Sequence, residues 1–253
     1  MDVSFVTFLI VVPLVFIGGF VDSIAGGGGL ITLPAYLAAG LPSHSAMATN
    51  KLSSTIGTSI SVIKYAKEGF INFKIAIPCG VLAILGSAIG SNIALLIDDF
   101  VLKIVLLALL PVSAIFVLNS KGLIKERAAF SFKQTLIVSL IIAFVIGAYD
   151  GFYGPGTGTF LIILLSFFAH LGLNESNGVS KIINLSSNVA ATVVFLCNGK
   201  VILLLGICAG IANALGNFLG SKFFISKGLK IVRPLMILVL ILLAIKVIYD
   251  FFV

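Results

Sequence analysis

Long apolar stretches, separated by short charged breaks, run through almost the whole chain. No Asp, Glu, Lys or Arg occurs in the ranges 3–21, 23–50, 75–97, 104–120, 134–149, 151–174, 182–199 and 201–221. Several of these ranges approach the ~20 apolar residues that a helix needs to cross a bilayer. Only helices and closed barrels satisfy their backbone in lipid, and long apolar runs without alternation exclude a barrel. The pattern therefore predicts an all-α, polytopic bundle of transmembrane helices.

The chain also resembles itself at an offset of 130 residues. Matched pairs at this offset include Gly26/Gly156, Gly28/Gly158, Lys51/Lys181, Gly86/Gly216 and Gly90/Gly220. With an offset two residues shorter, Asp22 aligns with Asp150. Because lysines and GxxxG pairs recur at one offset, we predict two homologous halves, 1–119 and 134–253, joined by a polar cytoplasmic linker, 120–133.

Each half is predicted to contain five helical segments. Those of the first half are 3–24, 29–41, 46–66, 73–97 and 100–119, and those of the second are 134–152, 158–171, 176–197, 200–225 and 230–252. The second segment of each half is short, since 29–41 covers only about 20 Å as a helix. We expect these two segments to be half-helices, tilted partial spans or re-entrant segments shielded by protein.

The charges of the loops indicate how the two halves are oriented. Lys64 and Lys67 make the loop after the third segment basic in the first half, whereas Lys222 and Lys227 make the loop after the fourth segment basic in the second. Since Lys and Arg collect in cytoplasmic loops, this pattern favours an inverted repeat with both termini outside and the linker inside. The alternative is a parallel repeat with four crossings per half and re-entrant second segments.

Composition supports a membrane environment and limits the partners. Hydrophobic residues make up 60% of the chain and charged residues 10%, against about 25% charged residues in soluble domains. The net charge of +7 is typical of basic cytoplasmic loops, so we expect no nucleic acid. The predicted partners are the lipid bilayer and a small anionic substrate, with a homo-oligomer left open. No cofactor or metal is expected, and the multi-pass chain is placed in the cell inner membrane.

Two glycine-rich breaks are the most informative motifs. The first follows Asp22 and contains Gly26, Gly27, Gly28 and Gly29, and the second follows Asp150 and contains Gly154, Gly156, Thr157 and Gly158. Glycines break a helix, and the helix that starts afterwards presents unpaired N–H groups and a partial positive charge, which favours an anion. We therefore predict a substrate-binding site at the two breaks. The alternative is that the glycines only allow close packing of helices.

Polar residues along the third segments supply a second candidate group. In the first half they are Thr49, Asn50 and Lys51, followed on the same face by Ser54 and Thr58, and in the second Lys181, Asn184, Asn188 and Thr192. Such stripes face a protein interior or a wet cavity, since lipid cannot satisfy them. We predict that Thr49, Asn50, Lys51, Lys181 and Asn184 contact the substrate. Alternatively, both lysines extend to the headgroups.

Asp22 and Asp150 are the carboxylates next to the glycine breaks. A buried aspartate in a transporter can carry a coupled proton. Either residue could instead cap nearby N–H groups or pair with a lysine. GxxxG pairs such as Gly86/Gly90 are predicted to pack helices closely.

With these residues assembled, the chain resembles the sulfite exporter TauE/SafE family of membrane transporters. The resemblance rests on Gly18-Gly19-Phe20-Val21-Asp22-Ser23-Ile24-Ala25, the glycine run with Leu33-Pro34, Ala48-Thr49-Asn50-Lys51-Leu52, Gly86–Gly90 and Gly154-Pro155-Gly156-Thr157-Gly158. It covers nearly the whole chain and implies transport of a sulfur-containing anion such as sulfite, thiosulfate or a sulfonate. One departure is that Leu164 stands in the second half where the first has Pro34.

These features favour a secondary transporter that moves a small anion by alternating access, and not an enzyme. The chain contains no Walker-type GxxxxGK[ST], HExxH or GxSxG motif. An anion channel shares most of the features and remains an alternative. An intramembrane aspartyl protease is a remote alternative, because a Gly-x-Gly-Asp partner for Tyr149-Asp150 is absent.

Overall fold

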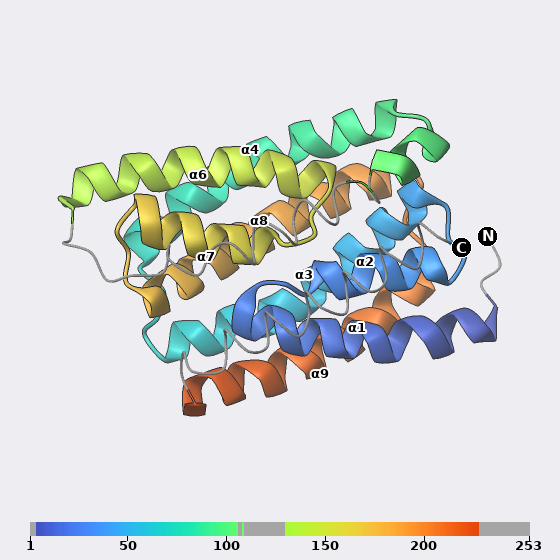
Figure 1. Ribbon diagram of the computed structural model, residues 1–253, viewed down its shortest axis with the longest axis horizontal. Coiled ribbons are helices and arrows are strands. Elements are labelled where there is room, and N and C mark those ends of the chain that lie inside the picture. The colour runs from blue at the N-terminus through green and yellow to red at the C-terminus, as the bar shows by residue number, and fades with distance from the viewer. Residues whose placement is uncertain (1–3, 106–107, 109–129, 228–253) are drawn as a thin grey trace.

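The computed structural model describes residues 4–105, 108 and 130–227, and this part of the chain is built from helices joined by short turns (Figure 1). The helices are α1 (Phe5–Ala25), α2 (Gly29–Ala38), α3 (Ser43–Lys67), α4 (Phe73–Leu96), α6 (Phe132–Phe152), α7 (Thr157–Phe168), α8 (Leu173–Cys197) and α9 (Leu203–Lys227). The predicted all-α class is confirmed. The first four predicted segments of each half are present, with ends shifted by a few residues.

The fifth predicted segment of each half falls largely or wholly outside the described residues. Of 100–119, residues 100–105 are helical, and 230–252 is not described. Most of the predicted linker is also outside, but its last residues are described. Helix α6 begins at Phe132 and not at 134, because Ser131 and Gln134 form a capping box that satisfies the first N–H groups.

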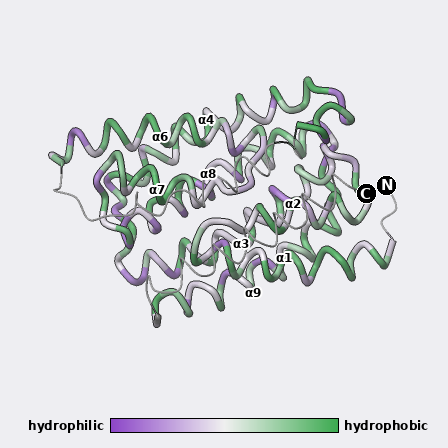
Figure 2. Tube along the Cα trace, in the orientation of Figure 1, coloured by the Kyte–Doolittle hydropathy of each residue, from purple (hydrophilic) through white to green (hydrophobic). Residues whose placement is uncertain are grey.

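Five of the described helices are long and apolar enough to cross a membrane, namely α1, α4, α6, α8 and α9. Their outer surfaces carry large exposed hydrophobic residues such as Leu9, Ile77, Ile141 and Ile211, each more than half exposed. Figure 2 shows apolar residues predominating on α1 and α6, while more polar segments lie on α3 and α8. Apolar side chains are stable on such a surface when lipid covers them.

Helices α3 and α8 form the centre of the bundle, with α1 beside α9 and α4 beside α6 (Figure 1). The predicted GxxxG packing is confirmed in both outer pairs. A Cβ atom at Gly86 would overlap the carbonyl group of Phe144, and one at Gly216 would overlap that of Phe16. Glycine therefore lets each pair approach to backbone contact.

The direction of the helices bears on the orientation of the halves. In Figure 1, α1 starts at the end marked N, whereas α6 starts at the opposite end of the bundle and runs the other way. Helices α3 and α8, the third segments of the two halves, are likewise opposed. This antiparallel relation is the one that an inverted repeat requires; the duplication itself stays a prediction.

Asp99 holds the beginning of α3. Its carboxylate accepts hydrogen bonds from the backbone N–H groups of Ser43 and His44, at 3.1 and 3.0 Å, and lies 2.9 Å from the His44 imidazole. Partial burial raises the pKa of Asp99, but the bonds from His44 and Ser43 outweigh that effect, so the pKa lies below its usual value. A carboxylate at this place stabilises the start of a helix.

Candidate functional site

Each glycine break ends one helix and starts a short one in the middle of the bundle. Helix α1 ends at Gly26 in the left-handed conformation, with φ 75°, and α2 begins at Gly29. In the second half, Gly154 and Gly156 have φ of 98° and 84° before α7 begins at Thr157. Because side chains disfavour this conformation, glycine is required where both breaks form.

The two breaks touch each other across the bundle. A Cβ atom at Gly26 would overlap the backbone of Gly158, and a Cβ atom at Gly158 would overlap Gly26 in return. The Thr159 N–H donates to the Gly26 carbonyl oxygen at 3.2 Å, and its hydroxyl donates to the Ala25 carbonyl oxygen at 2.7 Å. The glycines therefore serve close packing, the alternative considered from the sequence, as well as the breaks themselves.

Two buried ion pairs join the predicted halves. Lys51 on α3 lies 2.8 Å from Asp150 on α6, and Lys181 on α8 lies 3.1 Å from Asp22 on α1. The lysine side chains are 3% and 0% exposed, so the idea that they extend to the headgroups is wrong. Lysine and aspartate positions that match in sequence thus form two reciprocal pairs, each linking one half to the other.

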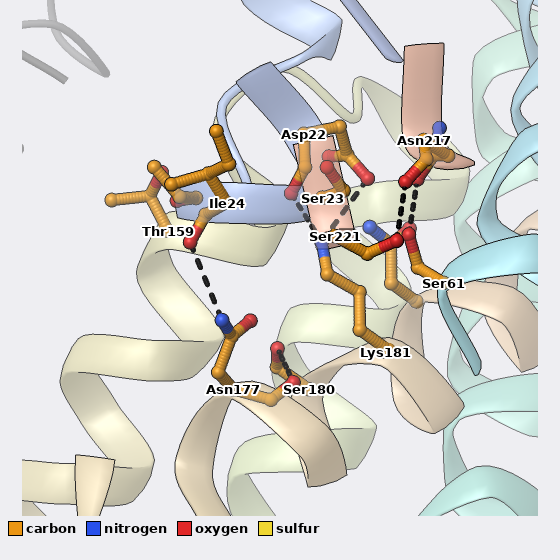
Figure 3. A network of polar contacts seen from close by, with 12 residues as sticks. Asp22, Ser23, Ile24, Ser61, Thr159, Asn177, Ser180, Lys181, Asn217 and Ser221 are labelled. Carbon is orange, nitrogen blue, oxygen red and sulfur yellow. Dashed lines mark hydrogen bonds and ion pairs between the residues drawn. The ribbon is translucent and has the colours of Figure 1, made fainter. Parts of the chain in front are cut away.

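The two aspartates have different surroundings. Asp150 Oδ1 accepts from Lys51 and from the Thr157 hydroxyl at 2.7 Å, while its Oδ2 accepts from the Ser187 hydroxyl at 2.5 Å. Asp22 accepts at its carboxylate from Lys181, which also donates to the backbone carbonyl oxygen of Asp22 (Figure 3). Asp150 is therefore the more firmly held carboxylate.

A small cavity lies between the breaks and the ion pairs. Its lining consists of polar and glycine residues from both halves: Asp22, Gly26, Gly28, Gly29, Thr32, Asn50, Lys51, Ser54, Thr58, Asp150, Gly154, Thr157, Gly158, Asn184, Asn188 and Asn213. The cavity volume is about 20 Å³, whereas one water molecule needs about 10–15 Å³. In this conformation the space between these residues is of the size that holds water.

Most of the predicted site residues line this cavity. Gly26, Gly28, Gly29, Asn50, Lys51, Gly154, Thr157, Gly158, Asn184 and both aspartates do so, whereas Gly27, Thr49, Gly156 and Lys181 do not. Thr49 accepts a hydrogen bond from the Ile202 N–H at 3.2 Å, which ties it to the start of α9. Lys181 reaches the site indirectly, through Asp22.

Two lining residues, Thr32 and Asn213, were absent from the sequence prediction. Thr32 is a polar residue one turn into the otherwise apolar helix α2. Its position next to the glycine run could have marked it as a candidate in the sequence. Asn213 lies on α9 and accepts a hydrogen bond from Asn217, one turn further along the same helix, at 2.6 Å. Its contact with Gly57, where a Cβ atom would overlap the Asn213 amide, depends on tertiary packing that the sequence does not display.

The cavity contains polar atoms that are available to a ligand. Among buried side-chain atoms of the described chain, Thr32 Oγ1 and Asn50 Oδ1 have no hydrogen-bond partner. At the start of α2, the N–H groups of Leu30 and Ile31 donate to the carbonyl oxygens of Gly27 and Gly28 at 3.1 and 2.9 Å, and the N–H groups that begin a helix have no partner within it. No cluster of three His, Cys, Asp or Glu residues that could hold a metal ion occurs within the described ranges.

An apolar helical bundle with broken helices, buried charges and a central polar cavity is the architecture of a membrane transporter. The chain belongs to the sulfite exporter TauE/SafE family, whose model matches residues 11–247. No solved structure matches the chain.

Relatives of similar length carry names of the same kind. A probable membrane transporter protein, ORF9, from a Sinorhizobium species is 35% identical over 98% of this chain and 95% of its own length. The probable membrane transporter protein YfcA of Escherichia coli K12 is 34% identical over 92% of this chain and 87% of its own. YdhB of Bacillus subtilis, a probable membrane transporter protein, is 27% identical over 88% and 89%.

Proposed function

We propose that this membrane transporter is a secondary carrier of a small anion, a sulfur-containing oxyanion or an organosulfonate, in the cell inner membrane. The observation that carries the proposal is the pair of buried ion pairs, Lys51–Asp150 and Lys181–Asp22, beside the two glycine breaks. Buried charges are costly in a membrane and mark substrate pathways. The sulfur chemistry is suggested by the name of the family alone.

The cavity offers the groups that an oxyanion needs. Lys51 and Asn184 line it and carry side-chain N–H donors, whereas the hydroxyl hydrogen of Thr157, which also lines it, is already donated within the protein. Helix α2 starts at the cavity, so its first N–H groups and its partial positive charge favour an anion there. These donors suit the several oxygen atoms of a sulfite or sulfonate.

Alternating access is favoured over a channel by the contacts that close the cavity. The backbones of Gly26 and Gly158 meet directly, and each ion pair spans the two predicted halves. Movement of one half against the other would break these contacts and open the cavity to one side at a time. We propose that the halves are an inverted duplication, 1–119 and 134–253, that moves in this way.

A proteolytic role fits the site poorly. Aspartyl proteases need two carboxylates close enough to share one proton. Asp22 and Asp150 are each paired with a different lysine and not with each other. We therefore assign them to binding and transport, and we propose no catalytic residue.

The proposed function is tested with the purified protein in liposomes. Uptake of labelled sulfite, thiosulfate, an alkanesulfonate and a carboxylate is measured over a range of concentrations. A carrier gives saturable uptake of one or more sulfur anions and exchange of internal for external substrate. Lack of uptake for every sulfur anion would refute the substrate class, and uptake without saturation or exchange would identify a channel.

A further inference from the structure

The charges around the cavity sum to zero. Asp22, Asp150 and Lys51 line it directly, and Lys181 lies behind Asp22. Among the described residues no other charged side chain borders the cavity. The remaining titratable group near Asp22 is Tyr65 of α3, whose hydroxyl donates to the Ser23 carbonyl oxygen at 2.5 Å. The site is thus electrically balanced before a substrate arrives.

An anion entering this site would give the buried cluster a net negative charge. It adds a negative charge to a buried, balanced cluster and comes close to two carboxylates. Interactions between charges are strong where water is excluded, so the unbalanced state is unfavourable. Balance is restored if one of the bordering carboxylates takes up a proton.

The contacts of the two aspartates indicate which of them takes the proton. The Asp150 carboxylate lies within hydrogen-bonding distance of Lys51 and of the Thr157 and Ser187 hydroxyls, each of which can donate its hydrogen to Asp150 or to a backbone carbonyl oxygen. Asp22 accepts from one side-chain donor, at 3.1 Å, and its side chain is 13% exposed against 3% for Asp150. Protonation of Asp22 therefore disturbs fewer hydrogen bonds than protonation of Asp150 would.

Lys181 can keep its place and its charge when Asp22 becomes neutral. Its ammonium donates to the backbone carbonyl oxygen of Asp22 as well as to the carboxylate (Figure 3). The backbone bond does not depend on the protonation of the side chain. Neutral Asp22 therefore leaves one uncompensated positive charge beside the cavity, which a monoanion balances.

We propose that each substrate anion is carried together with one proton, and that Asp22 holds this proton during transport. Asp150 stays ionised and serves as the fixed partner of Lys51. The inference rests on the proposed anion site and adds a second, obligatory cargo to it. Proton and anion bind together and leave together, so a pH gradient drives accumulation of the anion.

The test uses anions whose own charge does not change near neutral pH, because sulfite itself titrates there. Binding of ethanesulfonate and of thiosulfate to the purified protein is measured as a function of pH. With one proton bound per anion, the affinity for ethanesulfonate falls about tenfold for each pH unit on the alkaline side. D22N removes this dependence, whereas the matched control D98N, a change of an exposed carboxylate, retains it.

Proton flux gives a second readout that needs no variant. In liposomes, uptake of ethanesulfonate by the unaltered protein is expected to make the outer medium alkaline, with about one proton per anion. Binding or uptake that is insensitive to pH, or that follows a sodium gradient, would overturn the inference and leave the proposed function standing. A pH dependence that survives in D22N would overturn the assignment to Asp22. Failure of both anions to bind at any pH would count against the proposed function itself.

Discussion

At the scale of single residues, the burial of Lys51 and Lys181 is the feature with the largest energetic consequence. A buried ion pair contributes little net stability, but removing one partner leaves the other charge buried and alone. We expect K51M to lower the free energy of unfolding by about 3–5 kcal/mol, because Asp150 loses its countercharge. Adding D150N to K51M should restore part of that loss.

Thermal unfolding in detergent measures this effect, with K200M as the control. Lys200 is exposed in the turn before α9, so its replacement should change stability little. Equal unfolding temperatures for K51M and K200M would contradict the importance of the buried pair.

Alanine substitutions at Gly26 and Gly199 distinguish the effect of conformational strain from that of steric overlap. Both have positive φ, 75° and 65°, but a Cβ atom at Gly26 would overlap Gly158 whereas one at Gly199 would meet nothing within 4 Å. G199A should cost only the strain of the left-handed conformation, about 1–2 kcal/mol. G26A should cost clearly more and abolish transport, because the two breaks can no longer meet. Similar unfolding temperatures and uptake for the two variants would show that the contact is unimportant.

The sequence could identify most of the residues that the structure brings together around the cavity, but not all of their partners. The glycine runs and the matched lysines and aspartates stood out because they are unusual in an apolar chain. Pairing of Asp with Lys was one of several alternatives, and it is decided by the tertiary arrangement, which brings the Lys181 side chain of α8 to Asp22 of α1. Thr49 matched the same polar pattern yet lies against Ile202, since helical periodicity alone does not specify which neighbour a face meets.

At the scale of elements, the attachment of α3 to Asp99 predicts an effect of pH. The pKa of Asp99 is lower in the folded protein than in the unfolded chain, where it is about 3.9. The contribution of Asp99 to stability is therefore fully present above that value and is lost as the pH falls through the lower folded pKa.

We expect the difference in unfolding temperature between the unaltered protein and D99N to shrink as the medium is acidified. The measurement is thermal unfolding across a pH series, with D98N as control because the exposed Asp98 carboxylate accepts from the nearby N–H of Phe100. A difference that does not change with pH would mean that the Asp99 carboxylate does not hold α3.

The short helices α2 and α7 could be predicted from the sequence because glycines define where they begin. The predicted bounds 29–41 and 158–171 compare with Gly29–Ala38 and Thr157–Phe168. The predictions were too long at their C-terminal ends, where the apolar sequence continues past the last helical turn. Apolar residues alone do not mark the end of a helix inside a membrane.

At the scale of the whole molecule, the orientation of the halves has a direct test. In the inverted arrangement, the turn at Lys67 and the turn at Lys200 lie on opposite sides of the membrane. In the parallel arrangement they lie on the same side. Single cysteines at the two positions, in a chain without the native Cys79, Cys197 and Cys208, are labelled from outside with an impermeant thiol reagent.

We expect only the position at Lys200 to react in intact cells, because the inverted arrangement places the basic turn with Lys67 in the cytoplasm. After permeabilisation both positions should react, which controls for accessibility. Reaction of both positions, or of neither, before permeabilisation would refute the inverted arrangement.

The central claim is that the paired lysines form the anion site between the halves. It is tested most directly by uptake of a labelled alkanesulfonate or thiosulfate into liposomes containing K51Q, K181Q or the exposed control K200Q, each reconstituted in equal amounts. We expect K51Q and K181Q to lose at least tenfold in uptake while K200Q matches the unaltered protein. Unchanged uptake in K51Q and K181Q would contradict it.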